Sequence, residues 1–266
     1  MADLAVKIDT VAEPVEHNNV ISFSLIRNIA EQDAAKPKST RKGGKLAGQD
    51  SEVYAFRTTD EIKAIIDVLD KHIDDASNND QRKIAWRNKL LFIVGINIGI
   101  RASDLRTLKW SFFFNKQKDG TLKFNDFYKI QPKKTKKHGK FVKLFFNETI
   151  KKIISIYIEE YPIGDLDEYL FFSRKGNNPI SVNSMYHIIK DVAVEAGIEQ
   201  NVGSHSLRKT FGYWVWHNAK DKEKMLVILS QIYNHSDVST TRKYIGLTND
   251  EMEDAFNSLN LGLDLI

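Results

Sequence analysis

Apolar residues recur at helical intervals over most of the chain after its first fifty positions. They are spaced in this way between Ile62 and Leu69. Just before them, Thr58 and Glu61 have the spacing of a capping box. The same period continues further along the chain and predicts helices over residues 84–98, 147–161, 181–196 and 221–232. This pattern is typical of a mainly helical domain with one apolar face on each helix.

Between the helical segments, three short stretches are rich in aromatic and β-branched residues. They span residues 110–114, 122–130 and 141–145, and the basic segment QPKKTKKHGK joins the last two. We expect three short strands that form a small antiparallel sheet. The polar run SNNDQRK predicts a loop before the helix at 84–98, and Thr248 with Glu251 predicts a capped start for a final amphipathic helix. The expected fold class is mainly α with a small antiparallel β-sheet (α+β).

The first fifty residues differ in character from the rest. The stretch VISFSLIRNIA predicts a short helix near residues 20–31, and the following KPKSTRKGGKLAGQD is basic and rich in helix breakers. We therefore interpret residues 1–50 as a flexible tail or linker and residues 51–266 as one domain.

Composition removes several classes of function. The chain has no cysteine, which rules out disulfides, thiol nucleophiles and thiolate zinc sites. No apolar run approaches the ~20 residues of a membrane span, and the N-terminus lacks the order of a signal peptide, so we expect a cytoplasmic protein without a membrane partner. A formal net charge of +4 permits a polyanionic partner without requiring one. The positions of the charges along the sequence must therefore show whether the partner is a polyanion.

The segment GSHSLRKTFGYWVW, residues 203–216, places charged side chains at the start of an apolar helix. Ser204 is a suitable N-cap, and a spacing of three puts His205 and Arg208 on one side of the first turn. The positive end of the helix dipole lies at the same place. This arrangement predicts a site for an anion.

Three other segments supply groups for the same chemistry. Arg101 follows Gly99 in GIRASDLRTLKW, lysines crowd the segment KKTKKHGK, and YNHSDVSTTRKYIGL contains His235 and, nine residues later, Tyr244. Taken singly, each has an ordinary interpretation as a surface cation, a solvated loop or a half-buried phenol. Together they combine donors for oxygen anions with groups that transfer protons.

These groups match the chemical requirements of a phosphodiester under nucleophilic attack. The phosphodiester gains a second negative charge on its non-bridging oxygens, which two guanidiniums such as those of Arg101 and Arg208 bind in bidentate fashion. The phenol of Tyr244 must lose its proton to attack, and the leaving alkoxide must gain one. Lys134, His205 and His235 are the groups available for these proton transfers.

In this order the segments GIRASDL, Lys-Thr, HSLRKTF and NHSDVSTTRKY resemble the catalytic domain of the tyrosine recombinase, or phage integrase, family, over roughly residues 57–247. The resemblance implies that Tyr244 forms a 3′-phosphotyrosine with DNA and frees a 5′-hydroxyl, with no metal and no other cofactor. Arg101 and Arg208 would clamp the scissile phosphate. The implied activity is site-specific recombination of duplex DNA by integration, excision, inversion or resolution.

The resemblance also assigns the supporting residues. His205 would assist proton transfer, His235 would hydrogen-bond the phosphate, and Asp104 would support the first arginine. Lys134 would be the general acid, although its neighbouring lysines leave the choice open. The basic residues expected on DNA are Lys133, Lys136, Lys137, Lys140, Arg242 and Lys243.

Two departures from the family pattern shape the remaining expectations. The family usually has Leu-Gly where this chain has Tyr233 and Asn234. Its members usually carry a helical core-binding domain before the catalytic domain. An accessory DNA-bending or core-binding protein is therefore an expected partner, beside further copies of the chain on nucleoid DNA.

The segment 248–266 would dock on a neighbouring copy or pack on its own domain. The alternatives are a DNA-binding regulator without recombinase activity and a DNA-relaxing enzyme that resembles type IB topoisomerases.

Overall fold

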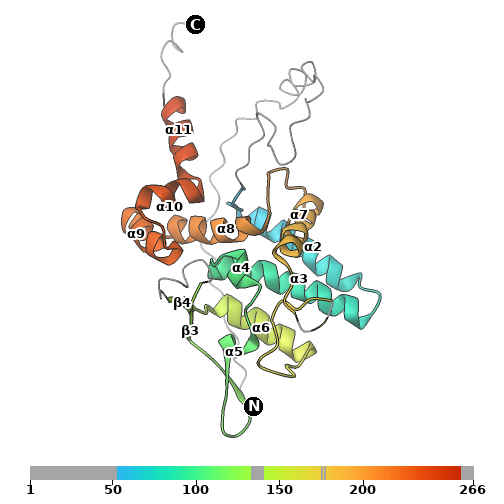
Figure 1. The fold of residues 1–266 in the computed structure, drawn as a ribbon. Helices are drawn as coiled ribbons and strands as arrows, with labels where there is room; N and C mark the ends of the chain where they lie inside the picture. Colours follow the sequence, from blue (N-terminus) through green and yellow to red (C-terminus); the bar gives the residue numbers. More distant parts are fainter. Residues whose placement is uncertain (1–52, 133–140, 175, 177, 259–266) are drawn as a thin grey trace, which may run out of the picture. The chain divides into compact units, whose positions relative to one another are not determined.

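The computed structural model describes residues 53–132, 141–174, 176 and 178–258. Residues Asp50–Ile266 group into one compact unit, drawn in Figure 1. The predicted tail helix, the five hairpin lysines from Lys133 to Lys140 and residues 259–266 lie outside the described residues. The longer helices are α2 (Thr59–Asp74), α3 (Asn79–Ile98), α6 (Glu148–Glu160), α7 (Val182–Glu195), α8 (Ser204–His217), α9 (Lys222–Tyr233), α10 (Val238–Ile245) and α11 (Leu247–Asn257).

The helices begin where side chains satisfy their first free N–H groups. Thr58 and Glu61 form the predicted capping box of α2. The side chain of Asn78 accepts the N–H of Gln81, so α3 begins at Asn79. The loop predicted over residues 77–83 is therefore right for residues 77–78 and wrong for residues 79–83. The sequence pattern missed this start because the first turn of α3 is polar and exposed. Among the described residues, no helix has both the length and the apolar character needed to cross a membrane.

Helix α3 forms the centre of the main hydrophobic core. It contacts α2, α6 and α8, and Leu90, Leu91 and Phe92 are fully buried along it. Burial on nearly every side explains why its apolar residues are not confined to one stripe. The end of α3 is consequently a fixed platform for the residues that follow it.

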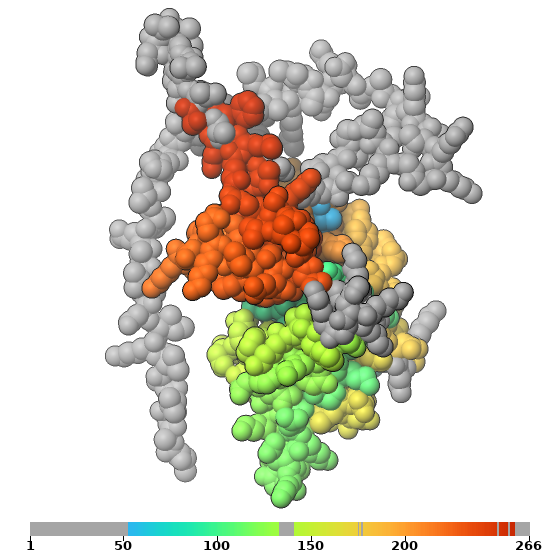
Figure 2. All heavy atoms as spheres, turned by 60° about the vertical axis from the view of Figure 1, so that its left-hand side comes forward, coloured from blue at the N-terminus to red at the C-terminus, as the bar shows by residue number. Residues whose placement is uncertain are grey.

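A second, smaller hydrophobic cluster joins α9 and α10. It contains Leu226, Leu229, Tyr233, Ile245 and Leu247, and residues of α8 pack against it. Helix α8 approaches this cluster closely at Gly212, where an added Cβ would lie 2.3 Å from the hydroxyl of Tyr233. Figure 2 shows α9 and α10 (orange to red) above the strands and α6 (green to yellow-green) on one face of the molecule. The two clusters thus meet along α8.

The antiparallel pairing is present, but it forms two hairpins instead of one sheet. Strand β1 (Phe114–Lys116) pairs with β2 (Leu122–Phe124), and β3 (Phe127–Ile130) pairs with β4 (Val142–Phe145). The expected strand over 122–130 is interrupted because Asn125 turns to bond the backbone of Phe112 and Phe113. The expected strand at 110–114 is mostly the short helix α5 (Trp110–Phe113). The mainly helical class with antiparallel β-structure is confirmed.

Two expected helix caps are also wrong. Gly203, not Ser204, precedes α8, and its N–H donates to the hydroxyl of Ser206. Helix α11 begins at Leu247, so Thr248 lies inside it, and the preceding Gly246 has a φ of 86°. This left-handed residue turns the chain sharply between α10 and α11, a conformation that glycine adopts without a steric penalty.

Candidate active site

The first arginine lies where α3 ends. Gly99 has a φ of 66° and turns the chain so that Arg101 precedes the short helix α4 (Ala102–Leu105). The Arg101 side chain is half-buried, and its Nη2 donates to the carbonyl oxygen of Tyr233 at 3.3 Å. A residue next to the central helix therefore contacts the end of α9.

Arg208 projects from α8 to the same carbonyl. Its Nη2 donates to the Tyr233 oxygen at 3.1 Å, its Nη1 donates to the Gly99 oxygen at 2.6 Å, and the residue is 5% exposed. Its guanidinium carbon lies 4.1 Å from the ring centroid of Tyr233. The structure therefore brings Arg101 and Arg208 together although they are far apart in sequence.

Tyr244 stands on α10, beside the two arginines. Asp237 caps this short helix and Gly246 ends it. Burial raises the pKa of the Tyr244 phenol above its ordinary value of 10.0, while the charge of Arg208, a hydrogen bond from it and the charge of Arg101 act in the opposite direction. The phenol is therefore protonated at neutral pH, with two cations placed to favour its ionised form.

The two predicted histidines approach the arginines and Tyr244 from different elements. His205 lies in the first turn of α8, and partial desolvation followed by the charges of Arg208, Lys209 and Arg101 lowers its pKa from 6.5. It is therefore mostly neutral at neutral pH, as a proton acceptor must be. The ring of His235 lies 5.3 Å from that of Tyr244.

The position of His235 depends on how α9 ends. Asn234 has a φ of 52°, which reverses the chain after the helix, and the His235 N–H then donates to the Ser230 oxygen at 2.9 Å. Its Nδ1 is hydrogen-bonded to the Thr241 hydroxyl at 2.9 Å. These contacts link His235 to both α9 and α10.

Asp104 lies buried in α4, three residues after Arg101. Two further buried residues, to which the sequence pattern assigned no role in the site, also belong to this region. Lys209 is 7% exposed, with its Nζ 5.6 Å from the ring centroid of Tyr244, and Tyr233 is fully buried. The available signal for Lys209 was a second cation inside an apolar helix, and for Tyr233 it was the departure from Leu-Gly.

The outer basic residues of α10 have a different setting. Arg242 donates to Glu223 at 3.1 Å and also bonds to Glu251, while Lys243 is exposed. The contact of Arg242 and Lys243 with DNA stays a prediction, as does the role of the lysines between residues 133 and 140. The cation of Arg242 is balanced by two carboxylates in the DNA-free protein.

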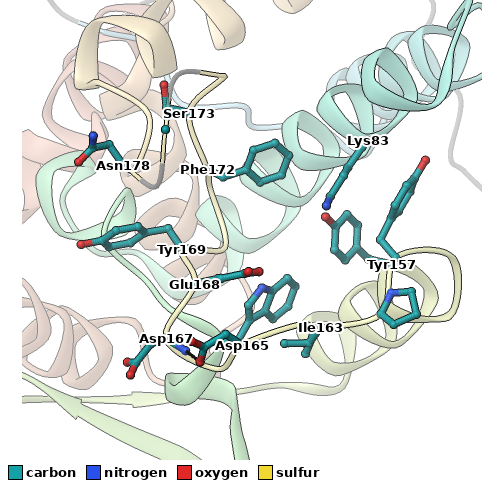
Figure 3. Close-up of a pocket in the computed structure, with 14 residues that line it drawn as sticks. Lys83, Tyr157, Ile163, Asp165, Asp167, Glu168, Tyr169, Phe172, Ser173 and Asn178 are labelled. Atoms are coloured by element: carbon teal, nitrogen blue, oxygen red, sulfur yellow. Dashed lines mark hydrogen bonds between the residues drawn. The ribbon is translucent and has the colours of Figure 1, made fainter.

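A separate cavity of 420 Å³ lies beside α6 and is shown in Figure 3. Trp110, Tyr157 and Phe172 line it, and the Nζ of Lys83 lies 5.5 Å from the Phe172 ring. Three carboxylates stand at its rim, including Glu168. None of the predicted site residues lines this cavity, and its acidic rim disfavours a phosphate, so the cluster of Arg101, Arg208 and Tyr244 is the better candidate.

Comparison with known proteins identifies the family of the chain. The model of the phage integrase family matches residues 56–251, which include Arg101, Arg208 and Tyr244. The chain belongs to this family. The chain is 35% identical over 170 residues to the probable integrase/recombinase YoeC of Bacillus subtilis, a match of 64% of this chain and 83% of that protein. It is 29% identical over 189 residues to the tyrosine recombinase XerH of Campylobacter jejuni, across 70% of this chain but only 48% of that relative.

Solved structures show the same fold. The chain superposes on the XerA recombinase with a TM-score of 0.53 and 20% identity, over 80% of this chain and 66% of that one. It superposes on XerH bound to palindromic difH substrate with a TM-score of 0.51 and 21% identity, over 82% and 59% of the two chains. These structures confirm the predicted tyrosine recombinase catalytic-domain fold, and the match to the phage integrase family confirms the predicted enzyme class.

Proposed function

We propose that this protein is a site-specific recombinase that cleaves and rejoins duplex DNA through a covalent 3′-phosphotyrosine at Tyr244. The observation that carries the proposal is the placement of the Tyr244 phenol beside two guanidiniums that share one backbone acceptor. A phosphate bound by both arginines would lie within reach of that phenol. The carbonyl shared by the arginines also satisfies part of their hydrogen-bonding capacity, which keeps them oriented without neutralising them.

The cleavage step follows from these positions. The Tyr244 oxygen attacks the phosphorus, the bond from phosphorus to the 5′-oxygen breaks, and the phenolic proton passes to a base such as neutral His205. The 5′-oxygen takes a proton from a general acid, for which Lys134 remains our candidate. Arg101 and Arg208 stabilise the added charge on the non-bridging oxygens.

Rejoining is the reverse of cleavage. A 5′-hydroxyl attacks the phosphotyrosine, and the Tyr244 phenol leaves with a proton. One phosphodiester-type bond is exchanged for another in each direction, so no external energy source enters the balance. Exchange of partners between the two steps gives recombination, whereas rejoining of the same ends relaxes the DNA.

Two tyrosines lie near the arginines, and only one suits the role of nucleophile. The hydroxyl of Tyr233 is fully buried and donates to the Arg208 carbonyl at 2.6 Å, and burial holds its pKa far above the ordinary value. Tyr244 is only partly buried, and the charges of both guanidiniums act to lower the pKa of its phenol. We therefore assign attack to Tyr244.

The C-terminal helix supports cooperation between copies on DNA. In Figure 1, α11 extends away from α8, α9 and α10. Its Met252 and Phe256 are 58% and 78% exposed, although both are large apolar residues. We infer that this face docks on a neighbouring protomer, and an accessory DNA-bending or core-binding protein remains a further proposed partner.

The test uses a nicked suicide substrate built from the DNA that flanks the coding region. We expect the parent protein to form a covalent adduct that survives denaturation, and Tyr244→Phe to form none while it still binds the substrate. Tyr169→Phe is the matched control, because this half-buried tyrosine lines the separate cavity.

Different outcomes separate the alternatives. Binding without any adduct by the parent protein would contradict the enzymatic proposal and favour the DNA-binding regulator. Equal cleavage of unrelated supercoiled DNA would favour relaxation over site-specific exchange. An adduct that persists in Tyr244→Phe would refute the assignment of the nucleophile.

A further inference from the structure

Tyr233 is the residue at which the separate parts of the proposed site meet. It ends α9, is 0% exposed, and contacts Arg101, Arg208 and Tyr244. No step of the cleavage scheme uses it. Its contacts fall into three groups, made by its carbonyl, its hydroxyl and its ring.

The carbonyl holds the two guanidiniums close to each other. It accepts from Arg101 at 3.3 Å and from Arg208 at 3.1 Å. The last carbonyls of a helix have no intrahelical partner and carry its negative dipole end, so two cations are well placed there. A single acceptor between two like charges offsets part of their repulsion and defines their separation.

The hydroxyl and the ring fix Arg208 from two further directions. The hydroxyl donates to the Arg208 carbonyl at 2.6 Å, which ties the end of α9 to α8. The ring lies against the Arg208 guanidinium, with 4.1 Å between the guanidinium carbon and the ring centroid. An aromatic face attracts a cation and restricts the plane of the guanidinium.

The other contacts of the ring reach the groups that flank the phosphate position. Its centroid lies 5.4 Å from that of Tyr244 and 5.3 Å from that of His235, at interplanar angles of 76° and 57°. Tyr233 thus contacts four of the proposed site residues. Gly212 leaves room for it, since a side chain there would overlap the Tyr233 hydroxyl.

We propose that Tyr233 is a positioning residue whose side chain orients Arg208 and Tyr244 beside the carbonyl that Arg101 and Arg208 share. The catalytic part of this inference rests on the proposed function. Tyr233 acts through these residues and touches no reacting atom. A leucine at this position would keep the shared carbonyl but would lose the aromatic face and the bond to the Arg208 carbonyl.

The first experiment measures adduct formation at saturating protein with Tyr233→Leu and Tyr233→Phe. We expect Tyr233→Leu to slow cleavage by about tenfold or more, because small displacements of positioned groups have large effects on rate. DNA affinity should change by less than about threefold. Tyr233→Phe keeps the aromatic face, so it should restore most of the rate.

Leu229→Ala is the matched control. Leu229 is fully buried in the same cluster and on the same helix, but no hydrogen bond joins its side chain to the described site residues. This variant should lower the melting temperature as Tyr233→Leu does, while its saturating cleavage rate stays near that of the parent at a temperature where both are folded. Equal loss of rate in Leu229→Ala and Tyr233→Leu would overturn the proposal.

A second measurement does not depend on cleavage. The arginine Nε resonances of the DNA-free protein are followed by NMR while inorganic phosphate is added. We expect Arg101 and Arg208 to respond together in the parent and in Leu229→Ala, and Tyr233→Leu to weaken the response. An unchanged phosphate response in Tyr233→Leu would refute the positioning role, whereas absence of any adduct in the parent would refute only the proposed function.

Discussion

Arg101 and Arg208 are predicted to be equally important for cleavage but very unequal for stability. Replacement of either by alanine removes one cation from the phosphate position and should slow cleavage by about a hundredfold. The two side chains differ in how much of the fold depends on them. Arg208 is 5% exposed and bonded to two backbone carbonyls, whereas Arg101 is half-buried with a single longer bond.

The magnitude follows from these contacts. A hydrogen bond to a charged group contributes about 1.5–3 kcal/mol, and Arg208 makes two to backbone carbonyls, so the gross contribution of these two bonds is about 3–6 kcal/mol. Desolvation of the guanidinium, which lowers its pKa, opposes this gain. We expect Arg208→Ala to lower the free energy of unfolding by about 2–4 kcal/mol and Arg101→Ala by about 1 kcal/mol or less.

The assay pairs urea denaturation with adduct formation on the suicide substrate, at a temperature where each variant is folded. Arg208→Lys serves as an intermediate, because it keeps a cation but lacks the planar fork that reaches both carbonyls. The structural role assigned to Arg208 would be refuted if Arg208→Ala were no less stable than Arg101→Ala. The catalytic role assigned to the two arginines would be refuted if either alanine variant cleaved at the parental rate.

Three further outcomes are expected. Because the pKa of His205 is lowered from 6.5, the folded protein binds fewer protons than the unfolded chain, and this residue contributes stability that is lost as pH falls through its folded pKa. The cleavage rate should decline over the same pH range. An unchanged decline of the rate at low pH in His205→Gln would contradict the role of His205 as proton acceptor. Gly212→Ala should lower the free energy of unfolding by about 1–3 kcal/mol and also slow cleavage, because its Cβ would lie 2.3 Å from the Tyr233 hydroxyl. A free energy of unfolding in urea and a cleavage rate equal to those of the parent would argue against this close approach. The double variant Met252→Ser, Phe256→Ser should reduce the assembly of several copies on DNA, as measured by sedimentation, while its free energy of unfolding changes by less than about 0.5 kcal/mol. Undiminished assembly would exclude docking through the exposed apolar face of α11.

Helices with a polar cap and a clear apolar stripe were predictable from the sequence. The capping box at Thr58 and Glu61 and the left-handed Gly99 are local features, so their consequences do not depend on distant residues. Prediction failed where tertiary contacts override local pattern. Trp110 lies in an aromatic stretch typical of a strand, yet its N–H donates to the Glu168 carbonyl and it forms part of a short helix.

The chemical character of the site was also predictable, but not its organisation. The residue types of Arg101, Arg208 and Tyr244 in their order indicated phosphodiester chemistry. The sequence pattern assigned no helix to the segment that carries Tyr244, because α10 is only eight residues long and largely polar. Tyr233 was noted as a departure from a pattern, whereas its burial and its shared carbonyl emerged only from the packing of α8 against α9.

Residue identity and short spacing were enough to predict the helical periods, the capping box of α2 and the set of chemical groups available to a phosphate. Only the tertiary structure decided that the end of α3, the second turn of α8 and the end of α9 converge. That convergence depends on which buried faces pack together and on where a free helix-end carbonyl finds its donors. Contacts over such sequence separations arise from the whole core, so no local stretch of sequence specifies them.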